Sequence, residues 1–491
     1  MKTQDNPGLK QQKRSNQIKA ACFVLACAIG LAAGQYLAVI VLAVLFYIAH
    51  QVLWSDHLFF DPRSDYHYNF SGSRHFQLTR DDDNFIIPNE LRAEPIPAAA
   101  TLTAFVKVRV VATRAGRFFD PRIRINNDTD SFKEAQGNNH LQFFERGCAG
   151  LRYINVTDAL LDEQGQWHQH INLTGTYCTI EGEAELLIFQ HADYRNKRLL
   201  IIAPHADDAE IAAFGLYSQA AGLHDGVHIV TLTAGEAGEK DYQHVYADSA
   251  QAAQLKGCLR AWDSVAIPRW GGVSADNVVN LGYFCLRLKT MHDNPDHVIT
   301  AKVAELDSVT LFRQYNQIAL PTDSDGRSTW NNLLTDLTAL IENIKPDAIV
   351  TPHMQLDPHE DHYYATVAVK QALSRSACPA ELLYYANHYL HTDMFPYGPA
   401  HSITGLPVNL TAEIDGGSVV CVPLSEHAQK QKAMSLAMQH DLQAPLSPKK
   451  KLRKYLQARL IGRIASPYGD DDYFRKAVKS SEIFFRDENN G

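Results

Sequence analysis

The sequence predicts an α/β protein in which a doubly wound, mostly parallel sheet follows a β-sandwich-like domain and an N-terminal membrane segment. Three observations support this prediction. Residues 20–54 are almost free of charge, residues 55–195 form short β-type runs separated by turn residues, and from about residue 197 strand patterns alternate with helix patterns. The 491 residues also exceed what one hydrophobic core usually supports, which favours two soluble domains.

Composition limits the classes of function. The net charge is -9, with 46 Lys and Arg against 55 Asp and Glu, so the chain as a whole lacks the basic excess that nucleic-acid binding requires. We therefore expect no nucleic-acid partner. The 8 cysteines include no Cys-x-x-Cys pair, which speaks against a disulfide framework and a thiolate zinc site. Cys148 and Cys178 flank a β-rich stretch and could pair in an oxidising compartment.

The N-terminal segment predicts a membrane anchor. Residues 1–19 form a polar, basic tail, and residues 20–54 contain no Asp, Glu, Lys or Arg. As one helix the apolar segment would span roughly 50 Å, whereas the hydrocarbon layer is about 30 Å thick. Two alternatives remain: a single tilted span, or a hairpin of two short spans that turns near Gly34–Gln35.

The two alternatives place the rest of the chain on opposite sides of the membrane. The basic tail belongs on the cytoplasmic side in both. A hairpin returns the remainder to the cytoplasm, whereas a single span exports it. We favour the hairpin, and so expect an anchor in the cell inner membrane, with membrane lipid as a partner and the following domains on the cytoplasmic side.

Residues 55–195 predict a β-rich accessory domain. Short runs of alternating or β-branched residues between turns are typical of an antiparallel β-sandwich. The clearest runs are Leu102–Ala112, Arg122–Ile125 and Glu185–Phe189. The many aromatic residues of this block suit either a carbohydrate-binding module or the core of a spacer or lid that packs on the next domain. We favour the second interpretation.

Residues 196–491 alternate between strand and helix patterns, which predicts βα units and a parallel sheet covered on both faces. Strands are expected at Arg198–Ala203, Val227–Thr233, Ala348–Thr351 and Leu382–Ala386. Helices are expected at about 208–221, at Trp330–Ile344 and at about 364–373. Such a doubly wound, Rossmann-like sheet binds ligands beyond the carboxyl ends of its strands, so polar residues that follow a strand are the candidates for function.

Two polar clusters follow predicted strands. The first contains His205, Asp207 and Asp208, and the second contains His359 and His362. A histidine beside adjacent carboxylates is costly to desolvate unless a divalent metal rewards the negative charge. His205 and Asp208 can reach one ion from positions i and i+3, and one histidine of the second cluster can complete the site. Three ligands with one open position is the arrangement of catalytic zinc.

At this point a family resemblance is evident. Residues from about 197 to 491 resemble the PIG-L/LmbE-like family of zinc-dependent N-deacetylases, in which a His-Pro-Asp-Asp motif joins a later His-x-Asp-His motif. The corresponding segments are His205-Ala206-Asp207-Asp208, His359-Glu360-Asp361-His362 and the loop Gly235-Glu236-Ala237-Gly238. Ala206 replaces the usual proline. The arginine that often precedes the helix after the Gly-Glu loop has no counterpart, which leaves the substrate contacts open.

The resemblance implies the roles of individual residues. It implies one Zn²⁺ per chain with three protein ligands: His205, Asp208 and His362. Asp207 would be the general base, and His359 would act as an acid or an oxyanion partner. Glu236 and Asp361 would contact the substrate, although a helix-capping carboxylate is the alternative for Glu236.

These roles imply a zinc-dependent amide hydrolase. We expect it to remove an acetyl group from an N-acetylated glycan or glycolipid, a lipid-linked or envelope N-acetylglucosamine derivative. The alternative is a non-catalytic, membrane-anchored glycan-binding or scaffold protein with a degenerate deacetylase fold. The intact set of ligands together with Asp207 favours the enzyme.

A basic segment near the C-terminus bears on the membrane alternatives. It begins with Lys449-Lys450-Lys451 and interleaves further Lys and Arg with leucine and tyrosine as far as Arg463. The pattern resembles a basic amphipathic helix that rests on an anionic leaflet, and a merely solvated helix face is the alternative. The membrane interpretation favours a cytoplasmic catalytic domain.

Overall fold

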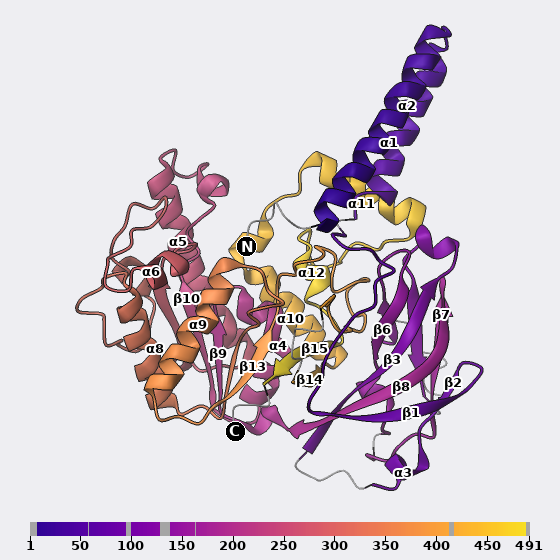
Figure 1. Ribbon diagram of the computed structural model, residues 1–491. Coiled ribbons are helices and arrows are strands. Elements are labelled where there is room, and N and C mark those ends of the chain that lie inside the picture. Colours follow the sequence, from indigo (N-terminus) through magenta and orange to yellow (C-terminus); the bar gives the residue numbers. More distant parts are fainter. Residues whose placement is uncertain are drawn as a thin grey trace.

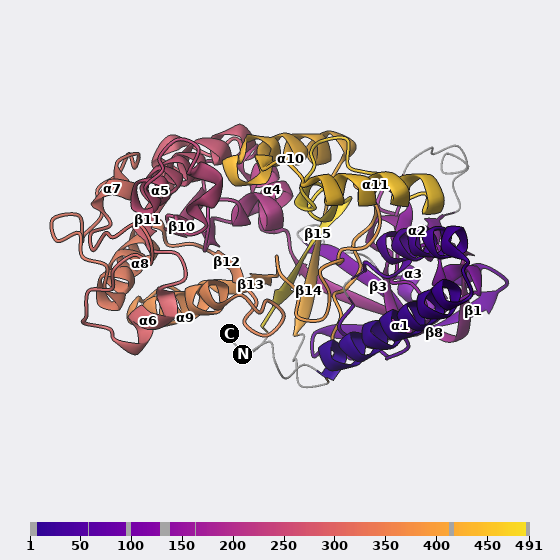
Figure 2. The same cartoon turned by 90° about the horizontal axis from the view of Figure 1, so that it is seen from above.

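The computed structural model shows two helices that project from a body made of a β-rich part and an α/β part (Figure 1, Figure 2). The structure describes residues 7–56, 58–94, 100–127, 138–162, 164–411 and 417–487. The first six residues of the predicted basic tail therefore lie outside the described residues.

The apolar N-terminal segment forms an antiparallel helical pair. Helix α1 (Pro7–Ala32) and helix α2 (Tyr36–Leu53) lie side by side in Figure 1, and Gly34 turns the chain between them with a φ of +70°. The rings of Phe23 and Phe46 stack with their centroids 4.2 Å apart. Among the described helices, α2 alone is long and apolar enough to cross a membrane, because the apolar part of α1 is shorter.

The β-rich part is an eight-stranded antiparallel arrangement. Its strands are β1 (Ser73–Asp81), β2 (Asn84–Ile86), β3 (Ala100–Ala112), β4 (Arg122–Asn126), β5 (Leu141–Phe143), β6 (Ala149–Asn155), β7 (His170–Thr176) and β8 (Cys178–Ala192), with the short helix α3 (Asn89–Arg92). The strand order is β5-β4-β7-β2-β1-β8-β3-β6. Strand β1 pairs with β8 through its first six residues and with β2 through its last three, so one strand joins two groups around a shared apolar core. Cys148 and Cys178 are both buried free thiols.

The α/β part is built on a seven-stranded sheet. Its strands are β9 (Leu199–Ala203), β10 (Val227–Thr233), β11 (Val278–Tyr283), β12 (Ala348–Pro352), β13 (Glu381–Tyr385), β14 (Ser418–Pro423) and β15 (Ser481–Arg486). The order is β11-β10-β9-β12-β13-β15-β14. The first five strands are parallel, and β15 is antiparallel to both of its neighbours. Thus the sheet is mostly parallel, with an antiparallel pair at one edge.

Helices cover both faces of this sheet. The helices of this part are α4 (Asp208–Ala221), α5 (Ser249–Ala266), α6 (Leu288–Asp293), α7 (Thr310–Arg313), α8 (Trp330–Ile344), α9 (Glu360–Arg375), α10 (Glu426–Met438), α11 (Pro448–Ile461) and α12 (Tyr473–Lys476). Helix α11 packs against α2 and not against the sheet. Alternate residues of β9 face opposite ways. Leu200 and Ile202 belong to the core that includes α8 and α9, and Leu199 and Ile201 belong to the core that includes α4.

The two parts share one core. Phe105 of β3 and Phe189 of β8 lie in the same apolar cluster as the central strands of the α/β sheet. Thr103 Oγ1 accepts a hydrogen bond of 2.7 Å from the backbone nitrogen of Cys421 in β14, and Asn155 donates one of 3.1 Å to the carbonyl of Thr404. The β-rich part is therefore packed firmly against the antiparallel edge of the α/β sheet.

Candidate metal centre

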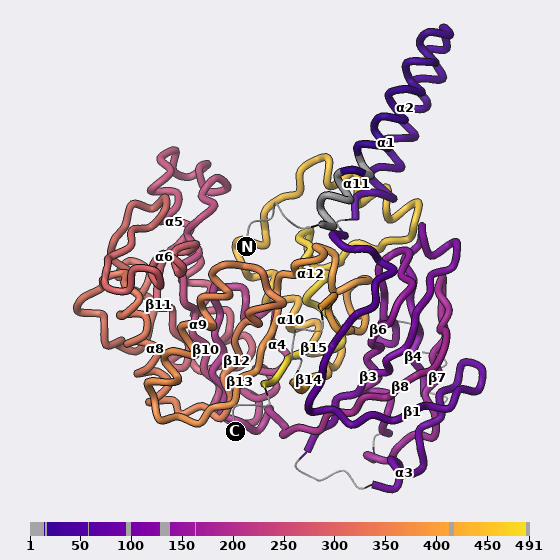
Figure 3. The backbone as a smooth tube through the Cα atoms, in the orientation of Figure 1, coloured from indigo at the N-terminus to yellow at the C-terminus, as the bar shows by residue number. Residues whose placement is uncertain are grey.

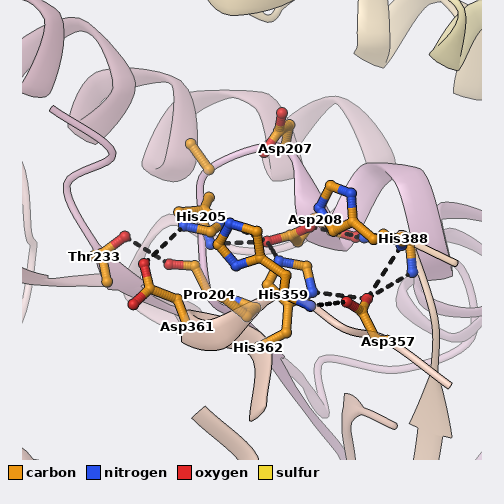
Figure 4. Close-up of polar contacts among 12 residues, drawn as sticks. Pro204, His205, Asp207, Asp208, Thr233, Asp357, His359, Asp361, His362 and His388 are labelled. Atoms are coloured by element: carbon orange, nitrogen blue, oxygen red, sulfur yellow. Dashed lines mark hydrogen bonds and ion pairs between the residues drawn. The ribbon is translucent and has the colours of Figure 1, made fainter. Parts of the chain in front are cut away.

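The two predicted clusters meet at one edge of the sheet. The loop that starts at Pro204 follows β9, and the loop that starts at His353 follows β12. Because β9 and β12 are adjacent and parallel, their carboxyl ends lie side by side. Asp207 is the N-cap of α4 and His359 is the N-cap of α9, so both clusters sit where a loop turns into a helix (Figure 4).

The three predicted ligands converge. The Oδ2 atom of Asp208 lies 3.1 Å from His205 Nδ1 and 3.2 Å from His362 Nε2. The side chains of Asp208 and His362 are almost fully buried, with 2% and 0% of the residue exposed. Asn387 donates a hydrogen bond of 2.8 Å to Asp208 Oδ1, which fixes the carboxylate in this orientation.

The outer nitrogen of each imidazole faces a second buried carboxylate. His362 Nδ1 lies 2.8 Å from Asp357 Oδ2, and His205 Nε2 lies 3.3 Å from Asp361 Oδ2. When these nitrogens carry the proton and donate it to the carboxylates, His205 Nδ1 and His362 Nε2 are left with free lone pairs. His362 Nε2 is buried without a hydrogen-bond partner among the described residues. Two lone pairs and the Asp208 carboxylate therefore point to one place, which fits a divalent metal.

The charges of the cluster also favour a cation. Burial lowers the pKa of His362, but Asp208 and Asp357 outweigh burial and raise it to about 10. Burial would raise the pKa of Asp208, yet the nearby His362 and His205 hold it well below its usual value. The buried carboxylates thus require positive charge beside them, and a divalent cation would supply it in place of the imidazole protons.

Asp357 orients His362 and belongs to no predicted set of site residues. Its carboxylate accepts hydrogen bonds from three backbone nitrogens, those of His359 at 3.1 Å, Asn387 at 3.0 Å and His388 at 3.2 Å. These bonds hold the carboxylate under the imidazole of His362. Asp357 appeared in the sequence only as one of several polar residues between the strand and the motif.

We expect Asp357→Asn to weaken metal binding without unfolding the protein. An amide cannot stabilise the Nδ1–H of His362 as a carboxylate does, so the affinity for a divalent metal should fall by about 10–100-fold. Competition with a chelating dye measures this affinity. The matched control is Asp276→Asn, because Asp276 is exposed and lies outside the cluster; equal metal affinity in both variants would show that Asp357 has no orienting role.

Two further histidines border the cluster. The ring centroid of His359 lies 5.1 Å from that of His205 and 4.7 Å from that of His362, and His388 stacks on His359 at 5.2 Å. Burial and the neighbouring imidazoles lower the pKa of His359 to about 4, so its ring is neutral at pH 7. The ligand atoms of His205, His359 and His362 lie within 4.8 Å of one another, as do those of Asp208, His362 and His388. No spacing in the sequence indicated His388.

Asp207 stands apart from the imidazoles. Figure 4 shows its carboxylate separated from the rings, and its Oδ1 accepts a hydrogen bond of 3.0 Å from Nη2 of Arg260 on α5. Arg260 is buried and also pairs with Asp441. Gly235 has a φ of +65°, and a Cβ there would lie 2.3 Å from Arg260 Nε. Thus an arginine from α5, which the sequence did not reveal, occupies this side of the site.

The two predicted substrate contacts lie behind His205. Glu236 accepts hydrogen bonds of 3.1 and 3.0 Å from the backbone nitrogen of Cys285, and Asp361 Oδ2 accepts one of 2.6 Å from that of Leu286. Glu236 is 1% exposed and Asp361 is fully buried. Burial raises the pKa of Glu236 to about 7. In this position the two carboxylates contact the 285–286 loop, and Asp361 also contacts His205.

Comparison with known proteins gives one family match and several distant structural similarities. Residues 200–373 match the family model described as "PIG-L: GlcNAc-PI de-N-acetylase". None of the curated proteins matches the chain. A solved N,N'-diacetylchitobiose deacetylase from Pyrococcus horikoshii is 14% identical, with a TM-score of 0.32, over 59% of this chain and 85% of that one.

Two other solved structures are similar to the same extent. The teicoplanin deacetylase Orf2, in a zinc-inhibited form, is 17% identical with a TM-score of 0.32, over 60% of this chain and 99% of that one. The 4-carboxy-2-hydroxymuconate hydratase GalB from Pseudomonas putida is 14% identical with a TM-score of 0.31, over 59% and 95% of the two chains.

Proposed function

The chain carries a PIG-L domain at residues 200–373, and we propose that it is an N-deacetylase that removes the acetyl group of an N-acetylated sugar. One observation carries the proposal: His205 Nδ1 and His362 Nε2 lie 3.1 and 3.2 Å from the same carboxylate oxygen of Asp208, so the three side chains can bind one ion. A scaffold that had lost its activity would have no need to keep two buried imidazoles oriented by two further buried carboxylates.

The metal that suits this set is Zn²⁺, one per chain. Two neutral imidazoles and a carboxylate are three ligands typical of catalytic zinc. When bound, the cation supplies a Lewis acid that polarises the amide carbonyl and lowers the pKa of water. Asp357 and Asp361 act as positioning residues, because each holds the outer nitrogen of a ligand imidazole.

The proton transfers are assigned to Asp207, and stabilisation of the oxyanion is assigned to His359. Water attacks the carbonyl carbon of the N-acetyl group and gives its proton to Asp207, whose Oδ1 is held by Arg260, so that Oδ2 is the accepting atom. A ring N–H of the neutral His359 donates a hydrogen bond to the oxygen that develops negative charge. The C–N bond then breaks, the nitrogen takes the proton from Asp207, and a free amine and acetic acid leave; the acid loses its proton to the solvent and becomes acetate.

The helical pair supports a membrane-bound substrate. We propose that α1 and α2 form a hairpin in the cell inner membrane, which keeps the body of the protein on the cytoplasmic side with the basic N-terminal tail. Its partners are then membrane lipid and a lipid-linked or envelope N-acetylglucosamine derivative. The antiparallel packing of the two helices and their exposed apolar side chains, such as Val24, Ile29, Leu37 and Ile40, support this placement.

Free-amine release tests the function. The detergent-solubilised, zinc-loaded protein is incubated with a panel of N-acetylated sugars and glycolipids, and primary amine and acetate are measured together. We expect equal amounts of both products from at least one N-acetylglucosamine derivative. Binding of a panel member without release of either product would support the glycan-binding scaffold instead.

A further inference from the structure

Helix α11 is a basic helix on the surface of the protein. Its sequence, PKKKLRKYLQARLI, contains no acidic residue, and none of its residues is buried. Leu452, Tyr455 and Leu460 are 44%, 59% and 52% exposed. The chain has no Asp or Glu between Asp441 and Asp470. Exposed apolar side chains flanked by basic ones are typical of a helix that lies in the interface of an anionic membrane.

The position of α11 fits that environment. Figures 1 and 2 show it beside the base of α2, and Figure 3 shows the chain passing this base on its way to the last strand. Gln457 donates hydrogen bonds of 3.2 Å to the carbonyl of Gln51 and 3.0 Å to Ser55 Oγ at the end of α2. Just beyond α11, Arg463 forms an ion pair with Asp56. The basic helix is thus fixed at the level where α2 would leave the hydrocarbon.

The segments on either side of α11 reach the candidate metal centre. Before it, Asp441 pairs with Arg260, which holds Asp207. After it, the hydroxyl of Tyr473 lies 3.3 Å from His388 Nδ1. Helix α11 therefore connects two segments that both contact residues of the candidate metal centre.

We propose that α11 lies on the anionic headgroups of the membrane beside the α1–α2 hairpin, and that this contact holds the two flanking segments, which reach Arg260 and His388, near the membrane surface. The proposal rests on the membrane placement of the hairpin and on the proposed function of the site. The partner is an anionic bilayer, because the outward residues Lys449, Lys451 and Arg459 have no acidic neighbours on their own helix, and the intervening Leu452 and Tyr455 can enter the headgroup layer.

Hydrogen exchange in nanodiscs tests the contact. The full chain is placed in nanodiscs of phosphatidylcholine alone or of phosphatidylcholine mixed with phosphatidylglycerol, and exchange of the α11 amides is followed by mass spectrometry. We expect exchange about tenfold slower in the anionic discs, because basic residues near such a surface are attracted to it. A triple variant, Lys449→Glu, Lys451→Glu and Arg459→Glu, should abolish the difference.

The control variant carries the same charge changes elsewhere, at the exposed Arg269, Lys302 and Arg375, and should keep the difference. Equal exchange of the wild type in both kinds of disc, or slowing that persists in the triple variant, would overturn the proposal. Co-elution of the triple variant with the discs reports the hairpin separately, and acetate release from a water-soluble N-acetylated sugar reports the deacetylase separately. Failure of the hairpin to insert, or absence of deacetylase activity, can therefore be distinguished from failure of the α11 contact.

Discussion

His362→Ala is expected to remove zinc binding and to lower the deacetylase kcat/KM on the order of 10⁴-fold. The substitution takes away the lone pair of Nε2 and leaves the buried carboxylates of Asp208 and Asp357 facing each other across the vacated space. A loss of this size corresponds to the several kcal/mol that a metal ion contributes to a transition state. Metal content by mass spectrometry and amine release are measured on the same preparation.

The control for this variant is His297→Ala, because His297 is exposed and distant in sequence from both motifs. Thermal unfolding separates loss of the metal from loss of the fold, and His362→Asn provides a second variant that keeps a polar group in the cavity. A folded His362→Ala protein that retains one tightly bound zinc would show that His362 is not a ligand.

Asp207→Asn should lower kcat by about 10²–10⁴-fold, because a general base usually contributes a factor of that size. The zinc content should stay at one per chain. The asparagine has nearly the same shape as the aspartate and can still accept a hydrogen bond from Arg260, but it cannot take a proton from water. Steady-state kinetics with the best substrate of the panel measure the effect.

Asp241→Asn is the matched control, because Asp241 is an exposed aspartate of the nearby 239–242 turn. An unchanged kcat in Asp207→Asn would show that Asp207 is not the general base. Loss of zinc would instead show that Asp207 is a metal ligand. The two results are distinguished by measuring metal content and kcat together.

The central strands and the two motifs could be predicted because their signals are local. A buried strand is a short apolar run, and the residues that follow it appear next to it in the sequence. Asp208 and His362 could therefore be assigned to one edge of the sheet from the amino-acid pattern alone, and the pairing of β9 with β12 places them there. Strands β11, β14 and β15 escaped prediction. Strands β14 and β15 join the sheet from a remote part of the chain by antiparallel pairing, outside the βα pattern on which the prediction rested.

The groups that orient the ligands could not be predicted for a different reason. Asn387 follows β13 and Arg260 lies on α5, and each reaches the site only through the tertiary fold. Nothing in their spacing marks them. Asp361 was predicted as a substrate contact from its place in a motif, which could not indicate that it is also buried 3.3 Å from His205 Nε2.

The most direct test of the metal centre is a crystal structure of the zinc-loaded protein with anomalous data at the zinc absorption edge. We expect one strong peak, bound by His205 Nδ1, the Asp208 carboxylate and His362 Nε2 at roughly 2.0–2.2 Å. A zinc peak bound instead by His205 Nε2, together with Cys285 and Asp361, would contradict the proposed site.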